Sequence, residues 1–247
     1  MRRYLLALTA CLCATAALAG GPTDMTDAER LAFRAEVKAY LLENPDVLVE
    51  AMTVLQARED AAAAQNDLTL VKTNADALFT NASDWVGGNP NGDITVVEFM
   101  DYRCGYCRKA HDEVNELVKS DGNIRYIVKE FPILGEGSIL SSQFAIAVRI
   151  IHGDDIYSKV RTALITLRGD ATVETLSRVA TDMGLDPAPI LAKMKTDAVN
   201  AIIQANHDLA NAMNITGTPT FVIDSGMVRG YVPLDGMRDL VKDARAG

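Results

Sequence analysis

Two cysteines separated by two residues stand between a predicted strand and a predicted helix, and no other feature constrains the fold as strongly. Residues 94–100 (ITVVEFM) are rich in β-branched and apolar side chains and have the length of a buried strand. Cys104 and Cys107 follow closely, and residues 108–119 then have a helical pattern. A cysteine pair that opens a helix directly after a strand is typical of a reversible redox dithiol. We therefore expect an α/β fold built around this junction.

The positions of the two cysteines on the helix assign them different roles. Cys104 lies at or next to the N-cap, where unpaired N–H groups and the positive end of the helix dipole favour a thiolate. Arg103, Arg108 and Lys109 add positive charge nearby. We predict that the pKa of Cys104 lies between about 3.5 and 7.5, the range of such motifs. Cys107, one turn further along, should be more buried and should attack a mixed disulfide formed at Cys104.

Three other roles for the cysteine pair agree less well with the sequence. A zinc site needs two further ligands, and the three histidines of the chain are His111, His152 and His207. Covalent haem attachment needs a histidine directly after the second cysteine, where this chain has Arg108. A structural disulfide that closes so small a ring stabilises a fold little. We therefore expect no metal ion and no cofactor at this site.

The N-terminal segment has the features of an export signal. Residues 1–19 combine two arginines with an apolar run that is too short to span a membrane, and Ala17-Leu18-Ala19 predicts cleavage before Gly20. The alternative is a lipoprotein that is acylated at Cys11. Cleavage before Gly20 leaves the CxxC pair as the remaining cysteines. The expected location is the periplasm.

Residues 20–80 are predicted to form a helical arm. The capping box Thr26–Glu29 starts a helix over about 27–43, and Asn44-Pro45-Asp46 starts a second helix that continues through the alanines 61–64. Three leucines recur every seven residues: Leu41, Leu48 and Leu55. This spacing favours a helix that associates with further copies of the chain. The alternative is an amphipathic arm that packs on its own domain.

A segment rich in Gly, Asn and Pro, residues 81–93, is predicted to separate the arm from the remaining elements. After the strand and helix that flank the cysteines, a second strand is expected over 123–133. Residues 138–213 have a helical pattern interrupted by glycines, and Asp186-Pro187 is predicted to start one last long helix of this block. The chain then returns to strands at 220–224 and 227–230 and closes with a helix over 234–245.

The charge of the chain argues against one class of partner. The sequence has 24 Lys+Arg against 33 Asp+Glu, a net charge of −9, and contains no run of five basic residues. The phosphate-neutralising charges that dominate nucleic-acid affinity are therefore missing. We expect binding to neither nucleic acid nor an anionic membrane surface.

The motifs of the second part resemble those of a known family. Cys104-Gly105-Tyr106-Cys107 and the later segment Gly217-Thr218-Pro219-Thr220-Phe221 look like the thioredoxin-fold disulfide oxidoreductases of the DsbA class, over roughly residues 84–247. The resemblance implies a thioredoxin fold with an inserted helical domain over about 138–213. It also implies a cis bond before Pro219, with Thr218 offering its backbone to an extended client peptide. Gly105 and Tyr106 would then also contact the client.

The resemblance assigns proton transfer to Glu98, six residues before Cys104. In the DsbA class, a buried acid at this place moves protons to and from the inner thiol, which here is Cys107. The alternative is a carboxylate that merely pairs with Lys129 on the neighbouring strand.

Within the class, the helical arm and the turn Gly88–Asp93 (GNPNGD) are similar to the Com1-like and ScsC-like subgroup. The Gly-Tyr dipeptide and the threonine before the proline resemble the isomerase DsbC, whereas DsbA has Pro-His and valine. A less oxidising dithiol suits isomerisation, because reduced Cys104 must attack wrong disulfides. The resemblance therefore implies a periplasmic thiol:disulfide oxidoreductase, an isomerase or reductase that acts on misfolded or reduced exported proteins.

Two alternatives remain open. The first is a DsbA-type disulfide oxidase. The second is a periplasmic copper-binding protein in which the paired thiolates hold Cu(I), assisted by Met100 or Met213. The resemblance further implies a membrane redox partner of the DsbD, ScsB or DsbB type. A homo-oligomer formed through the arm would bring several dithiols to one client.

Overall fold

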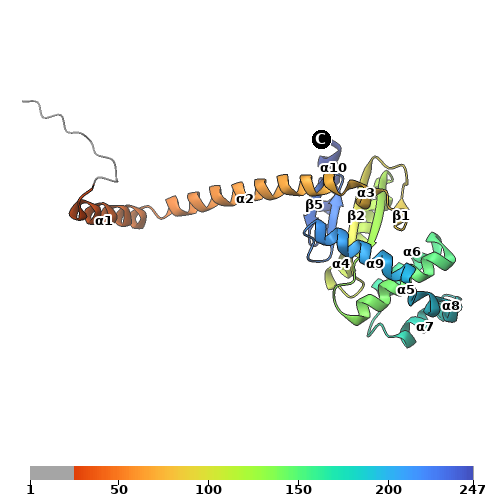
Figure 1. Ribbon diagram of the computed structural model, residues 1–247. Helices are drawn as coiled ribbons and strands as arrows, with labels where there is room; N and C mark the ends of the chain where they lie inside the picture. Colours follow the sequence, from red (N-terminus) through yellow and green to blue (C-terminus); the bar gives the residue numbers. More distant parts are fainter. Residues whose placement is uncertain (1–24, 247) are drawn as a thin grey trace, which may run out of the picture. The chain divides into compact units, whose positions relative to one another are not determined.

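A computed structural model describes residues 25–246 of the 247-residue chain. The predicted export signal, residues 1–19, and the alternative acylation site Cys11 lie outside the described residues. The chain divides between Glu59 and Asp60 into two compact units. The first contains the described part of the arm up to residue 59, and the second contains the rest of the arm together with a sheet and its covering helices (Figure 1).

Helices and strands follow one another in the order expected for an α/β chain with a helical insertion. The helices among the described residues are α1 (Asp27–Glu43), α2 (Asp46–Thr73), α3 (Ala75–Phe79), α4 (Gly105–Asp121), α5 (Glu136–His152), α6 (Asp154–Ile165), α7 (Val173–Asp182), α8 (Pro187–Met194), α9 (Asp197–Ala212) and α10 (Leu234–Ala246). The strands are β1 (Trp85–Gly88), β2 (Ile94–Met100), β3 (Ile124–Glu130), β4 (Thr220–Ile223) and β5 (Gly226–Arg229).

The arm is helical, as predicted, and α1 begins with the predicted capping box. The backbone N–H of Thr26 donates to the Glu29 carboxylate at 2.8 Å, and the Glu29 N–H donates back to the Thr26 hydroxyl at 3.4 Å. Between residues 25 and 59 no side chain is buried. The exposed large apolar side chains of this segment are Leu31, Phe33, Val37, Tyr40, Leu42, Leu48, Val49, Met52, Val54 and Leu55.

The sheet has the strand order β1-β3-β2-β4-β5 and is mixed. β2 and β3 are parallel, with Glu98 opposite Val128, whereas β1, β4 and β5 run antiparallel to their neighbours. The parallel pair is joined through α4, which begins directly after β2 and carries both cysteines at its start. The predicted α/β architecture is therefore confirmed.

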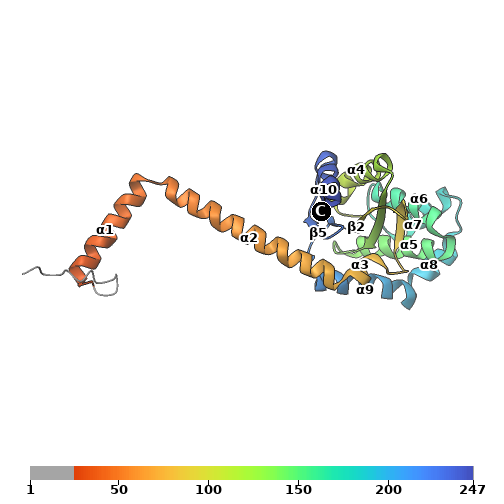
Figure 2. The same ribbon diagram turned by 90° about the horizontal axis from the view of Figure 1, so that it is seen from above.

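Alternate residues of the central strands face two different helical layers, since successive side chains of a strand point to opposite faces. The even-numbered residues of β2 and β3, such as Val96 and Tyr126, face the core shared with α4, α6 and α10. The odd-numbered residues, such as Val97 and Ile127, face the end of α2, α3 and α9. Figure 2 shows the sheet between these two groups of helices. Each fully buried large apolar side chain contributes about 1.5–3 kcal/mol.

The helical insertion, α5 to α9, stands between β3 and β4, as expected. Two details differ from the prediction. The helix that starts at Pro187 ends after two turns at Met194, and α9 begins anew at Asp197, without a glycine or proline to mark the break. In addition, the segment 81–93 contains the edge strand β1, which the turn-forming residues around it concealed.

The length and hydropathy of the helices bear on whether any of them could span a membrane. No helix within residues 25–246 is long and apolar enough to cross a bilayer.

Candidate redox site

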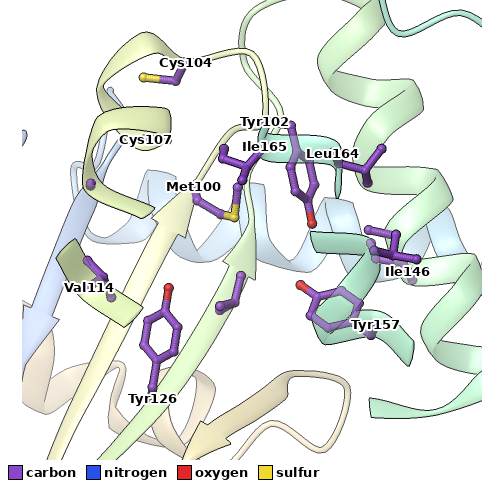
Figure 3. Close-up of a cluster of buried hydrophobic side chains, with 14 of the residues drawn as sticks. Met100, Tyr102, Cys104, Cys107, Val114, Tyr126, Ile146, Tyr157, Leu164 and Ile165 are labelled. Atoms are coloured by element: carbon purple, nitrogen blue, oxygen red, sulfur yellow. The ribbon is translucent and has the colours of Figure 1, made fainter. Parts of the chain in front are cut away.

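Cys104 is the N-cap residue of α4, with φ −71° and ψ 123°. Both cysteines are free thiols, and Figure 3 shows them at the start of α4, beside the core cluster that contains Met100 and Tyr126. Cys104 is 8% exposed and Cys107 is 1% exposed. The inner cysteine is therefore the more buried of the two, as its place on the helix predicts.

The surroundings of Cys104 stabilise its thiolate. A hydrogen bond with Cys107 is the largest cause that lowers the pKa of Cys104, to about 5, and the backbone N–H groups of Cys107 and Tyr106 act in the same direction. Partial burial opposes this change. The value lies within the predicted range. Hydrogen bonds at the helix start therefore contribute most, rather than the charges of the nearby basic side chains.

Two of those basic side chains make other contacts. Arg108 donates through Nε to the carbonyl oxygen of Tyr102 at 3.2 Å. The Nζ of Lys109 lies 4.2 Å from the centre of the Tyr231 ring, within the range of a cation–π contact. Neither side chain is among the main causes that lower the pKa of Cys104.

The pKa of Cys107 changes in the opposite direction to that of Cys104. Its hydrogen bond to Cys104, its burial and the nearby carboxylate of Glu98 all raise the pKa of the Cys107 thiol. The pair is therefore polarised: the outer sulfur is held as a thiolate and the inner sulfur retains its proton. This difference suits an attacking thiol and a resolving thiol.

Glu98 is buried on β2 and faces the same layer as α4. The Tyr126 hydroxyl donates a hydrogen bond to its Oε2. Burial raises the pKa of Glu98, while the positive charge of Arg161 and the bond from Tyr126 oppose this rise. The carboxylate is close enough to raise the pKa of Cys107. Its placement fits the proton-transfer role implied by the resemblance.

The alternative pairing of Glu98 with Lys129 is wrong. Lys129 is opposite Phe99 in the parallel register, so its side chain points to the other face of the sheet. There its Nζ forms an ion pair with Asp84 and donates to the carbonyl oxygen of Ala77 at 2.6 Å. The cation near Glu98 is instead Arg161 of α6.

The Thr218–Pro219 peptide bond is cis, which confirms the prediction. It lies in the loop before β4, and the carbonyl oxygen of Thr218 lies 3.1 Å from the Cys104 sulfur, from which it accepts a hydrogen bond when that sulfur is protonated. Residues more than a hundred positions apart are thus in direct contact. The loop occupies the place from which its backbone can meet a peptide bound at Cys104.

The two residues between the cysteines present different surfaces. An added side chain at Gly105 would meet no atom within 4 Å. Tyr106 is 63% exposed, and its ring stacks on that of Tyr231 with 6.2 Å between centres. The sequence did not indicate Tyr231, because it lies far along the chain in a segment without a recognisable motif.

Asp101 is a further polar residue at the site, and no sequence motif marks it. Asp101 is fully buried and accepts hydrogen bonds from the backbone of Arg103, Ile133 and Leu134 and from the hydroxyl of Ser138. It thereby connects the loop between β2 and α4, here called the cysteine loop, to the loop after β3. Its position directly after β2 could have indicated a role at the site, but an acid at such a position is also typical of an ordinary turn.

Metal ligands do not gather in the described part of the chain: residues 25–246 contain no group of three or more His, Cys, Asp or Glu that could hold an ion. Met100 belongs to the core cluster of the cysteines, whereas Met213 belongs to the cluster on the opposite face of the sheet. Of the two methionines considered as copper ligands, Met100 is therefore the one that shares a cluster with the thiols.

Comparisons with known proteins agree with this geometry. The thioredoxin family model matches residues 80–243, and the model of the N-terminal domain of the copper resistance protein ScsC matches residues 29–62. The chain also resembles the solved structure of a thioredoxin-like oxidoreductase from Silicibacter pomeroyi. The two are 39% identical, with a TM-score of 0.66 over 70% of this chain and 98% of the other.

Three further similarities extend the comparison. BcfH of Salmonella enterica Typhimurium is 26% identical, with a TM-score of 0.74 over 88% of this chain and 96% of the other. The thiol:disulfide interchange protein DsbA of Bordetella pertussis is 28% identical over 66% of this chain and 80% of its own length. The chain spans about a quarter of the length of other curated relatives, Na⁺/H⁺ antiporters such as that of Salinispora arenicola, at 26% identity.

The family match covers the sheet, the dithiol and the cis-proline loop, and the second match covers most of the arm. The chain belongs to the thioredoxin family, and within it to the proteins of the DsbA-like and ScsC-like type.

Proposed function

We propose that this chain is a periplasmic protein disulfide isomerase or reductase that acts on misfolded or reduced exported proteins. The observation that carries the proposal is the polarised pair: the pKa of Cys104 is about 5, that of Cys107 is raised, and the outer sulfur contacts the Thr218 carbonyl. Such a site forms a mixed disulfide at one sulfur and resolves it with the other.

The reaction follows from the roles of these groups. The Cys104 thiolate attacks a client disulfide, forms a mixed disulfide and expels one client thiolate, which takes a proton from water. In isomerisation, another client thiolate then attacks the client sulfur of this bond and releases Cys104. In reduction, Cys107 gives its proton to Glu98 and attacks Cys104. The second client thiolate leaves, and Cys104 and Cys107 form a disulfide. The dithiol has then given two electrons to the client disulfide, which is reduced to two thiols.

Client contacts are assigned to the surface around Cys104. Thr218 and Pro219 offer backbone to an extended peptide, and Gly105 leaves space beside the sulfur. Tyr106, exposed and stacked on Tyr231, provides an apolar contact. The proposed site residues are therefore Cys104, Cys107 and Glu98 for the chemistry, with the loop and the dipeptide for the client.

The direction of the reaction is supported by the strength of thiolate stabilisation. The outer cysteine has a pKa near 3.5 in the strong oxidant DsbA and near 7 in thioredoxin. A value of about 5 at Cys104 stabilises the reduced form less than in DsbA. Because stabilisation of the reduced form is what makes DsbA oxidising, we expect a more reducing dithiol here.

Measurement of the reduction potential of the Cys104–Cys107 pair in glutathione buffers tests this direction. We expect a value at or below about −180 mV, the potential of protein disulfide isomerase. A value near about −120 mV, as for DsbA, would support the oxidase alternative. In the cell, an isomerase or reductase needs a membrane partner of the DsbD or ScsB type to supply electrons, whereas an oxidase needs one of the DsbB type.

The arm is proposed to join copies of this chain. Its apolar side chains are exposed throughout residues 25–59, and Leu48 and Leu55 keep the heptad spacing along α2. Sedimentation of the full chain should show an oligomer that the double substitution Leu48→Asp and Leu55→Asp dissociates. Glu50→Lys, on the same helix, is the control. A monomer for the unsubstituted chain would remove this part of the proposal.

Copper binding is a second candidate function, favoured by the match of the arm to the N-terminal domain of a copper resistance protein. The soft thiolates could hold Cu(I) with Met100 close by. Titration of the reduced protein with Cu(I), compared with Cys104→Ser, tests it. Equal affinity of both proteins would assign any copper to another place.

A further inference from the structure

Arg161 of α6 is a cation buried inside the fold. It is 3% exposed, and its guanidinium lies 5.2 Å from the ring centres of both Trp85 and Tyr126. Within residues 25–246 it forms no direct ion pair, and its Nε has no hydrogen-bond partner there. A buried charge without an ion-pair partner lowers the stability of the fold. Arg161 is therefore expected to have a role other than packing.

The contacts of Arg161 lead to the redox site through one hydroxyl group. Its Nη1 donates to the Tyr126 hydroxyl at 3.0 Å, and that hydroxyl donates to Glu98. Its Nη2 donates to Asn115 Oδ1 at 2.8 Å, and the Asn115 amide contacts His111 Nε2 at 3.1 Å. His111 and Asn115 are one and two turns after Cys107 on α4. The network therefore connects the helical insertion to the helix of the dithiol.

We propose that Arg161 is a positioning residue for the dithiol: through the Tyr126 hydroxyl it holds Glu98 as the carboxylate that takes the proton of Cys107. The inference rests on the proposed function, because it concerns the step in which Cys107 resolves a mixed disulfide. In that step the proton moves from the Cys107 sulfur to Glu98, the Cys107–Cys104 bond forms and the Cys104–client bond breaks. The client thiolate leaves, and Glu98 afterwards releases the proton to water.

Electrostatics gives the direction of the effect. Glu98 is buried, so its pKa is raised, and the charge of Arg161 is the largest factor that opposes this rise. Removal of that charge raises the pKa of Glu98 further. Less carboxylate is then present at neutral pH to accept the proton of Cys107. Resolution must therefore shift to higher pH.

Other titratable groups face Glu98 and need separate consideration. Those that interact with Glu98 directly are Cys104 and Cys107 at the start of α4, Tyr126 on β3 and Arg161 on α6. Those that interact with Arg161 are His111 on α4, Glu130 on β3, Tyr157 on α6 and Tyr102 on the loop after β2. Burial, followed by Arg161, lowers the pKa of His111 to about 4, so this histidine is neutral at pH 7. Burial raises the pKa values of the tyrosines well above 10, so they too stay neutral.

Glu130 is the remaining acid of this layer. Its pKa is raised to about 7, and Arg161 also favours its ionised form. Its own contacts are the hydroxyls of Tyr102, Tyr157 and Ser142, whereas Tyr126 contacts Glu98. The substitution Glu130→Gln therefore separates any effect that Arg161 exerts through Glu130 from its effect through Glu98.

A cleft connects this network to solvent. It has a volume of about 380 Å³ and is lined by Trp85, Asn115, Tyr126, Ser158 and Arg161, among others. Tyr126, which donates to Glu98, and Arg161 both line this cleft, so the network has access to solvent through these two residues.

The experiment follows the release of glutathione from a mixed disulfide at Cys104, by rapid mixing of the reduced full chain with oxidised glutathione over a range of pH. In Arg161→Met, we expect the pH midpoint of release to rise by about one unit or more, with a tenfold slower release at pH 7. Arg161→Lys should restore part of the shift. Tyr126→Phe removes only the connecting hydroxyl and should shift the midpoint in the same direction, so it carries the test if Arg161→Met does not fold.

The controls distinguish this role from a structural one. Arg149→Met removes a cation of the neighbouring helix α5, which bonds to Asp154 at 2.7 Å, and should leave the midpoint unchanged. In the Glu98→Gln background, Arg161→Met should cause no further slowing. The inference is overturned if Arg161→Met and Tyr126→Phe keep the midpoint of the unsubstituted chain, or if Arg161→Met slows the Glu98→Gln protein equally. If no mixed disulfide forms at Cys104 at all, the proposed function itself fails.

Discussion

The thiol of Cys104 lies 3.1 Å from the carbonyl oxygen of Thr218, although 114 positions separate the two residues along the chain. This contact brings together the start of α4, which follows the C-terminal end of β2, and the loop that precedes β4. It places the attacking sulfur beside a backbone segment that can pair with an extended peptide. In the proposed function, the chemistry of the dithiol and the binding of a client therefore share one surface.

Substitution of the inner cysteine should change the acidity of the outer one. The hydrogen bond from Cys107 is the largest cause of the low pKa of Cys104, about 5. We expect Cys107→Ala to raise the pKa of Cys104, and the ultraviolet absorbance of the thiolate as a function of pH measures it. A pKa that stays at its original value in Cys107→Ala would show that the helix N–H groups alone stabilise the thiolate.

Glu130 should make the stability of the fold depend on pH. Burial raises its pKa from 4.5 to about 7, while hydroxyls of Tyr102, Tyr157 and Ser142 donate to it, and Figure 3 shows the two tyrosine hydroxyls pointing toward one another. The folded state thus keeps the proton more tightly than the unfolded state does. Its contribution to stability is fully present below pH 4.5 and is lost as the pH rises through about 7.

Glu130→Gln removes this dependence, because the amide stays neutral. The free energy of unfolding of Glu130→Gln, minus that of the unsubstituted protein, should increase by about 3 kcal/mol between acidic and mildly alkaline pH. Urea unfolding at a series of pH values measures the difference. A difference that does not vary with pH would contradict the raised pKa.

Asp101 should support the cysteine loop. Its carboxylate accepts four hydrogen bonds, of which the one from Ser138 is buried and the others are partly buried, and a lost acceptor leaves these donors without their partner in the fold. We expect Asp101→Ala to lower the free energy of unfolding by about 2–4 kcal/mol and Ser138→Ala, which removes one donor, by about 1 kcal/mol. Urea denaturation compares the two. Equal small losses would indicate that water replaces the carboxylate.

Local patterns in the sequence predict much of the fold and of the dithiol. The β-branched run before Cys104, the helix after it and the capping box at Thr26 are local signals, and each element lies where it was expected. The edge strand β1 escaped prediction because glycines and asparagines surround it. The end of α8 at Met194 escaped prediction because no helix-breaking residue marks it.

Polar partners across the fold were harder to predict than the elements. Tyr126 lies on the same face of the sheet as Glu98, and Lys129 lies on the other face, because of the alternation of side chains and the register between β2 and β3. This register cannot be predicted from the sequence of either strand alone. The contact of Arg161 with the site was harder still to predict, because only the packing of the helical insertion brings α6 to the sheet. The acid of the site was therefore recognisable in the sequence, whereas the groups that determine its ionisation were not.

Reactivation of scrambled ribonuclease tests the central claim most directly, because it requires both attack on wrong disulfides and release of the client. The reduced full chain should restore ribonuclease activity, and Cys104→Ala should have no activity above the buffer control. Cys107→Ala should accumulate more mixed disulfide than the unsubstituted chain, because only a client thiolate can then release Cys104. Full reactivation by Cys104→Ala would contradict the assignment of Cys104 as the nucleophile.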